Sequence, residues 1–213
     1  MDTNLFALKS IRHPYYFLPI PGNEHSSVKT LLKYNEADYM ETSFIKGKPA
    51  HKLQDSQLWH AVRLPQIKST SGWKKDNFGF TMLSSPFIRL ASAYENYRSG
   101  KLLEVEVVDS EIDFLDFLCI VEDSESLRNI YLSQTRMLRP WLDVIDKVFL
   151  QDCGYEHFTH VTLCIFGREQ TTTRYVFPPS IPNRYLGYYN NRDIVERLMN
   201  LCKEDFSFIE SIC

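Results

Sequence analysis

Residues 155–177 constrain the fold of this chain more than any other stretch. Positions 157–166 are mostly β-branched or aromatic, a composition that favours a strand. Positions 168–173 are polar and turn-like, and a second β-branched and aromatic run follows at 174–177. The pattern predicts a hairpin at the centre of a β-sheet, with the rest of the chain arranged around it.

The composition sets the expected class of protein. The 213 residues are 44% hydrophobic and 24% charged, as in an ordinary soluble globular protein. We expect one domain over residues 1–213, with a subdivision into parts 1–77 and 78–213 as the alternative. Net charge is −3 and the 24 Lys and Arg are scattered, with no basic run longer than Lys74-Lys75. A nucleic-acid partner is therefore not favoured.

Cysteine usage and the N-terminus indicate a compartment. The five cysteines form an odd set in which no two lie within ten residues of each other: Cys119, Cys153, Cys164, Cys202 and Cys213. These spacings match neither a zinc site nor a full disulfide framework. No apolar run reaches the length of a signal peptide or a membrane span. We expect reduced thiols in a bacterial-style cytosol, no metal, no cofactor and no membrane, with Cys164 inaccessible inside the central strand.

The chain before residue 109 is expected to alternate short elements with loops. The pattern predicts, in order, an edge strand at 15–20, a short helix after Ser26 and Ser27, an irregular segment at 35–57, a strand at 58–64 and a loop at 69–77. A strand–helix–strand unit follows, made of a strand at 78–83, an N-cap at Ser84 or Ser85, a helix from Pro86 to before Gly100, and a strand at 102–108.

The C-terminal part is expected to repeat that unit. Asn190 and Asn191 take the place of the serine cap, and Ile194, Leu198 and Leu201 recur at helical spacing. Few identities support the match, so two unrelated units of ordinary size are the alternative. The other predicted elements are a strand at 111–121, a helix from about Pro140 to Gly154, and strands at 185–189 and 206–209.

Together these elements predict an α+β protein. We expect a mixed, mostly antiparallel sheet with a few helices packed on it, in which the strand–helix–strand unit recurs as a pseudo-repeat.

The first candidate site is His160, followed two positions later by Thr162. On a strand both side chains share one face. The run resembles the histidine–apolar–threonine–apolar signature of the two-histidine phosphoesterases, which implies a histidine acting as acid or base on a bound phosphate. That family uses two such motifs and this sequence has one, so a histidine packed on the sheet is the alternative. His157 would lie on the opposite face, so the pair is not expected to bind a metal.

The second candidate site resembles the Arg, Ser-Thr-Ser and Glu-x-Glu triad of ADP-ribosyltransferase domains. The resemblance implies an arginine that grips the NAD pyrophosphate, a serine that orders the pocket and a glutamate that steadies charge on the ribose. Ser/Thr triplets and alternating glutamates also arise by chance, which is the alternative interpretation. The matching residues in this chain are Arg63, Ser69, Thr70, Ser71, Glu104 and Glu106.

The third candidate is an aromatic and arginine-rich stretch at 175–189. Tyr and Arg carry much of the binding energy at protein interfaces, and three prolines would hold this segment extended. The alternative is a proline-rich connection whose aromatic side chains pack on the core. The predicted partner-binding anchors are Arg184, Tyr185, Tyr188 and Tyr189.

Organisation alone suggests a function: from residue 78 onward, a capped helix feeds a strand, and a second such unit follows at the C-terminus. This order resembles the stand-alone immunity proteins that bacteria encode beside polymorphic toxins. The resemblance implies a non-catalytic protein that neutralises a partner, such as a cognate toxin, by direct contact. We adopt protein binding as the expected function, with an NAD-using or phosphodiester-cleaving enzyme as the alternative.

Overall fold

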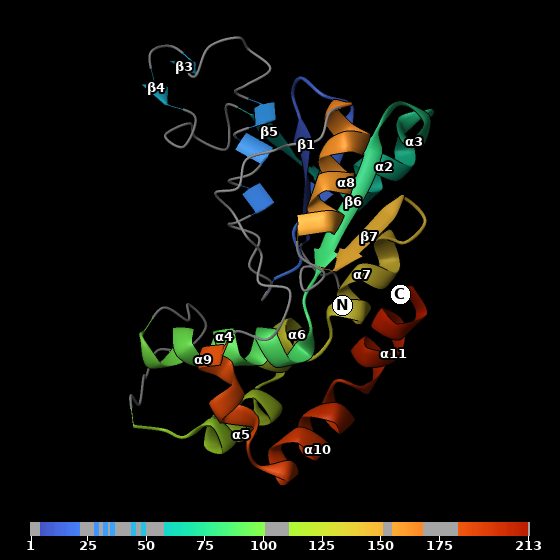
Figure 1. Ribbon diagram of the computed structural model, residues 1–213. Helices are drawn as coiled ribbons and strands as arrows, with labels where there is room; N and C mark the ends of the chain where they lie inside the picture. Colours follow the sequence, from blue (N-terminus) through green and yellow to red (C-terminus); the bar gives the residue numbers. More distant parts are fainter. Residues whose placement is uncertain are drawn as a thin grey trace.

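The computed structural model describes residues 5–21, 28–29, 32–33, 35–36, 44–45, 48–49, 58–100, 111–150, 155–167 and 183–212 (Figure 1). These residues form an α+β structure, as the sequence predicts. A mixed sheet carries helices on both faces, and a group of helices lies beyond the end of its central strand β6.

The main sheet has five strands in the order β5-β1-β2-β6-β7. The pairs β5–β1 and β1–β2 are antiparallel, whereas β2–β6 and β6–β7 are parallel. The sheet therefore joins chain segments on both sides of residue 77, and its ladders divide equally between the two types. The strands are β1 (Phe6–Ser10), β2 (Tyr15–Leu18), β5 (Trp59–Arg63), β6 (Phe78–Leu83) and β7 (Lys147–Leu150), with a separate pair β3 (Phe44–Ile45) and β4 (Lys48–Pro49).

The central strands β2 and β6 are covered on both faces. All four residues of β2 are buried, and so are the last five of β6, which explains their nearly continuous apolar sequences. Gly79 pairs in register with Tyr16, and a Cβ at Gly79 would lie 2.3 Å from the Tyr16 ring. Only glycine leaves room for that ring, so the close packing of β2 on β6 depends on it.

The two faces of the sheet are covered by different helices. A helical segment at residues 28–29, 32–33 and 35–36, called here the N-terminal helical segment, shares one face with α8. The opposite face is covered from α2, α3, α7, η3 and α11. The helices are α2 (Leu64–Ser69), α3 (Trp73–Asp76), α4 (Pro86–Arg98), α5 (Phe114–Asp123), α6 (Glu125–Tyr131), α7 (Gln134–Leu138), η3 (Arg139–Trp141), α8 (Tyr155–Phe166), α9 (Asn183–Leu186), η5 (Gly187–Tyr189), α10 (Arg192–Leu201) and α11 (Lys203–Ile212).

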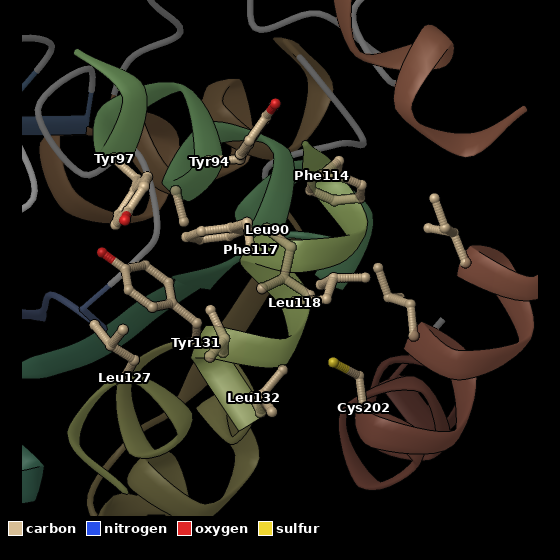
Figure 2. Packing of buried hydrophobic residues seen from close by; sticks show 14 residues of the cluster. Leu90, Tyr94, Tyr97, Phe114, Phe117, Leu118, Leu127, Tyr131, Leu132 and Cys202 are labelled. Atoms are coloured by element: carbon tan, nitrogen blue, oxygen red, sulfur yellow. The ribbon is translucent and has the colours of Figure 1, made fainter. Parts of the chain in front are cut away.

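The helices beyond β6 enclose an aromatic cluster of their own. Figure 2 shows this cluster, in which side chains of α4, α5 and α6 meet Cys202. The ring centroid of Phe117 lies 5.5 Å from those of Tyr94 and Tyr97, at tilted angles that suit aromatic pairs. The aromatic side chains of α4 and α5 therefore serve largely for internal packing.

A buried ion pair ties this helical group to α11. Arg89 Nη1 lies 3.1 Å from Asp205 Oδ2, and neither side chain is exposed. The Asp205 carboxylate also accepts hydrogen bonds from the backbone N–H groups of Gln134 and Thr135, at 3.2 and 2.8 Å. It thereby caps the N-terminus of α7, whose own N-cap residue provides no side-chain bond. One carboxylate thus holds α4, α7 and α11 together.

The predicted central hairpin is wrong in its first half. Residues 155–166 form the helix α8, and residues 168–177 lie outside the described residues. Val161 and Thr162 are buried and Ile165 and Phe166 half-buried, whereas positions 160, 163, 164 and 167 are exposed. That alternation has a helical period, so packing of one face on the sheet overrides the strand preference of the residue types.

Four other predicted elements are also wrong. The expected strand at 111–121 is the helix α5, capped by the Asp113 side chain, which accepts from the N–H of Asp116. The helix expected near Pro140 is the short η3 followed by β7, because parallel pairing with β6 takes Val148 and Phe149 into the sheet. The strands expected at 185–189 and 206–209 are helical. The predicted pseudo-repeat is therefore absent from the described C-terminal part.

The predictions based on capping residues and short apolar runs are confirmed. Strands occupy most of 15–20, 58–64 and 78–83, and Pro86 begins α4 with Ser85 as its N-cap. The first of these strands, β2, is the middle strand of the sheet and not the expected edge strand, and the loop expected at 69–77 contains the helix α3. Asn191 caps α10 by accepting from the N–H of Asp193. The strand expected at 102–108 lies outside the described residues. Within the described ranges, every helix is too short or too polar to cross a membrane.

Candidate functional site

The structure separates His160 from Thr162. Both lie on α8, where positions two apart do not face each other. His160 is exposed beside Phe149, with 6.1 Å between ring centroids, whereas Thr162 has no exposed surface. The expected shared face is therefore wrong. His157 and His160 stand three positions apart on this helix and not on opposite faces of a strand. Among the described residues, no group of three or more His, Cys, Asp or Glu could hold a metal ion.

The described members of the second candidate set serve to shape α2. Arg63 is the N-cap residue of this helix, and its backbone N–H donates to the Gln66 side chain at 2.7 Å. At the other end, the hydroxyls of Ser69 and Thr70 donate to the carbonyl of Gln66, at 3.0 and 2.9 Å. Glu104 and Glu106 lie outside the described residues. The arginine and the hydroxyls thus occupy opposite ends of one helix.

The predicted partner-binding tyrosines pack inward. Tyr185 is 1% exposed and lies in a cluster with Ile88 and Ala91 of α4. Tyr188 is half-buried and stacks on Phe114, with ring centroids 5.2 Å apart. The Tyr189 hydroxyl donates to the carbonyl of Phe87, and burial raises the pKa of that phenol. The side chain of Arg184 lies outside the described residues. The arrangement matches the alternative interpretation, in which these aromatics pack on the core.

Cysteine placement differs from expectation at one position. Cys164 is exposed on α8, so the prediction that it is inaccessible is wrong. Cys119 is half-buried and Cys202 buried, and both are free thiols like Cys164. Burial, with the nearby Asp205 charge, raises the pKa of Cys202 to about 12. Cys202 is therefore an inert core residue and Cys164 an accessible thiol.

A hollow lined by lysines lies on the α2–α3 side of the sheet. We call it the lysine groove; it has a volume of about 530 Å³ and is open to solvent. Its floor is apolar and comes from Ile67, Trp73 and Val144, which belong to the cluster on that face of the sheet. Its rim carries Lys68, Lys74 and Lys75.

Local sequence explains how the rim is built. Gly72 has φ +84°, a left-handed conformation that lets the chain turn sharply from α2 into α3. The turn after η3 brings Asp143 to the same place: its backbone carbonyl accepts from Lys74 Nζ at 3.0 Å, and its carboxylate lies 3.5 Å from Lys68 Nζ. The groove lining thus carries three lysines and one carboxylate, that of Asp143, so the lining itself is positive although the whole chain is acidic. The Asp76 carboxylate lies close by, next to Gly72.

Trp73 anchors the floor of the groove. Its indole packs on the Tyr16 ring, with centroids 5.9 Å apart. Its Nε1–H is buried and has no hydrogen-bond partner among the described residues. The described lining contains neither histidine nor cysteine, and the hydroxyl of Thr70 donates to the carbonyl of Gln66. An apolar floor with a charged rim is also found at protein interfaces.

The sequence held a partial signal for this groove. Lys74-Lys75 is the longest basic run and directly follows Trp73. What the sequence could not show is that Asp143 and Val144, about 70 positions later, complete the lining.

No family model, no curated protein and no solved structure matches this chain.

Proposed function

We propose that the protein works by binding another protein through the lysine groove, and not by catalysis. The observation that supports this proposal is the combination of an apolar floor with a rim of three lysines. Charge complementarity favours a partner segment that carries carboxylates around an apolar side chain. Leu142, 39% exposed and next to Asp143 in the chain, adds apolar surface close to the rim.

The placement of the candidate catalytic residues also supports a binding function. Enzymes need their acid, base or nucleophile within about 3 Å of one another or of the substrate. His160 and Thr162 lie on different sides of α8, and Arg63 and Ser69 at opposite ends of α2. The described parts of both sets are therefore arranged as ordinary structural residues.

Toxin neutralisation is the narrower form of the proposal. The two capped helices behind the resemblance to immunity proteins are α4 and α10, but α10 leads into α11 and not into a strand. The narrower proposal is tested in cells: a toxin encoded next to this chain should kill the host unless this protein is co-expressed. Survival without co-expression would reject the immunity role and leave protein binding in place.

The binding proposal is tested by charge reversal. A partner identified by co-purification from the native host is titrated against the parent protein and the double variant Lys74→Glu/Lys75→Glu. We expect the affinity to fall by about tenfold or more, mainly through slower association, with the remaining binding less sensitive to salt. The matched control is Lys203→Glu, a charge reversal at an exposed lysine on α11, which should bind like the parent protein.

Two results would overturn the proposal. Equal affinity of the parent and the double variant, with both folded, would place the interface elsewhere. If His160→Ala or Glu106→Ala abolished a biological activity while binding stayed intact, an enzyme of the phosphoesterase or ADP-ribosyltransferase type would replace it.

A further inference from the structure

A buried carboxyl group joins the N-terminal helical segment to the face of the sheet on which that segment packs, opposite the lysine groove. Glu36 has no exposed surface. Its Oε1 accepts from the Ser10 hydroxyl at 2.7 Å and from the Tyr15 hydroxyl at 2.5 Å. Trp59 Nε1 in turn donates to the Tyr15 hydroxyl at 2.9 Å. Residues of β1, β2 and β5 thus converge on one oxygen atom of Glu36.

The second oxygen of Glu36 has a different environment. Oε2 is buried and has no hydrogen-bond partner among the described residues. Lys9, which interacts with Glu36 through its charge, donates from Nζ to the carbonyls of Ser10 and His13, at 2.7 and 2.8 Å. A buried carboxylate is costly unless both oxygens are hydrogen-bonded or paired with a cation, so this environment disfavours the ionised form.

The groups around Glu36 offer little to offset that cost. Arg12, in the β1–β2 turn, is exposed, and its charge lowers the pKa of Glu36. His13 packs edge-on against Phe166 of α8, 4.9 Å between centroids, and Lys33 lies 5.9 Å from the centroid of the Trp59 ring. Burial is accordingly the largest influence on Glu36 and raises its pKa, against the lowering effect of the hydrogen bonds from Tyr15 and Ser10.

We infer that Glu36 is a neutral carboxylic acid in the folded protein and acts as a proton-dependent latch that holds the N-terminal helical segment on the sheet. Loss of the proton leaves a buried charge with an unpaired oxygen, which is relieved when the segment moves away. Val28 and Leu32, which pack in the cluster beneath the segment, are then uncovered. The latch lies on the sheet face opposite the lysine groove, so it does not rest on the proposed function.

The direction of the pH effect follows from proton counting. A carboxyl with a raised pKa binds more protons in the folded than in the unfolded chain at pH values between its ordinary value, 4.5, and its raised one. Stability is therefore highest below pH 4.5 as far as this group is concerned, and is lost as pH rises through the raised pKa. One such proton changes the folded-to-unfolded ratio by at most about tenfold per pH unit.

The test compares the parent with Glu36→Gln in urea unfolding from pH 4.5 to pH 8. The amide keeps an oxygen to accept both hydrogen bonds but does not ionise, so the ratio of the two folding constants should shift progressively in favour of the variant as pH rises. Glu210→Gln on α11 removes an exposed carboxyl group; it is the control and should follow the parent at every pH. A pH-independent difference between Glu36→Gln and the parent would overturn the inference.

A second measurement keeps the inference testable if the glutamine variant does not fold. In the parent protein labelled with ¹³C at the glutamate carboxyl carbon, one resonance should titrate clearly above the ordinary range. Titration of every glutamate at ordinary values would overturn the inference. Hydrogen exchange in the N-terminal helical segment, corrected for its intrinsic pH dependence, should accelerate over the same range as that titration; unchanged protection would also overturn the inference.

Discussion

Asp205 and Glu36 are both fully buried carboxyl groups, and their surroundings differ in the feature that decides what a buried charge can do. Asp205 has both oxygens engaged, one by Arg89 and Gln134 and the other by Thr135. Glu36 has two hydrogen bonds on one oxygen and none, among the described residues, on the other. Asp205 is therefore held by a countercharge and by hydrogen bonds on both oxygens, whereas Glu36 is stable when neutral and responds to pH.

The two sites also differ in what they connect. Asp205 joins α4, in the region beyond β6, to α7 and α11, which cover one face of the sheet, and its partner Arg89 is also buried. Burial lowers the pKa of Arg89, and the charge of Asp205 counteracts that effect. Glu36 instead joins a short helical segment to strands β1 and β2 through the hydroxyl groups of Ser10 and Tyr15. A charge balanced by a countercharge gives rigidity, and a proton-dependent contact gives a segment that can be released.

The largest expected effect comes from Asp205→Asn. The change leaves the Arg89 charge buried without a counterion and weakens the cap on α7, so we expect a loss of about 3–5 kcal/mol in the free energy of unfolding. Urea unfolding at pH 7 measures it. The double variant Arg89→Met/Asp205→Leu should recover part of the loss, because no unpaired charge stays buried. A loss below about 1 kcal/mol in Asp205→Asn would remove the distinction between the two carboxyl groups.

A smaller effect is expected for Tyr15→Phe. This change removes one hydrogen bond to Glu36 and leaves the buried Trp59 Nε1 without its acceptor, at a cost of about 1–3 kcal/mol. The Tyr15 hydrogen bond lowers the pKa of Glu36, so its loss raises that pKa further. The pH-dependent loss of stability should then extend to higher pH than in the parent, as measured by unfolding at a series of pH values. A pH profile with the parent's shape would show that Tyr15 does not govern the proton on Glu36.

The elements that could be predicted from the sequence were those whose signal comes from residues close together in the chain. Ser85 and Pro86, and Asn191, mark helix starts through groups within the next few residues, so α4 and α10 were predicted correctly. In α8 the residue types favour a strand and only the spacing of buried positions favours a helix. Competition of that kind is decided by packing against the sheet, which a single sequence does not show.

The candidate sites depend on contacts between residues that are far apart in the chain. The groove combines residues 67–75 with Asp143 and Val144. The Glu36 contacts join positions 21 and 26 apart in the chain, and Glu36 falls in a segment expected to be irregular. Neither set has a spacing pattern, because the contacts arise only when separate elements meet on the sheet. By contrast, the patterns around His160 and Arg63 that resemble catalytic motifs are local in the sequence. In the structure, His160 lies on the surface of α8 and Arg63 at the start of α2.

The smallest expected effect belongs to a carboxylate on the surface, which sets the baseline for the comparison. Glu196 on α10 accepts from Arg192 Nε at 2.6 Å, but the two side chains are 56% and 89% exposed. Water and salt screen such a pair, and ordering both side chains offsets most of the attraction. Glu196→Ala should therefore cost less than about 0.5 kcal/mol in urea unfolding at physiological salt, with an unchanged pH profile. A loss above about 1 kcal/mol would mean that burial is not what sets Asp205 and Glu36 apart from a carboxylate on the surface.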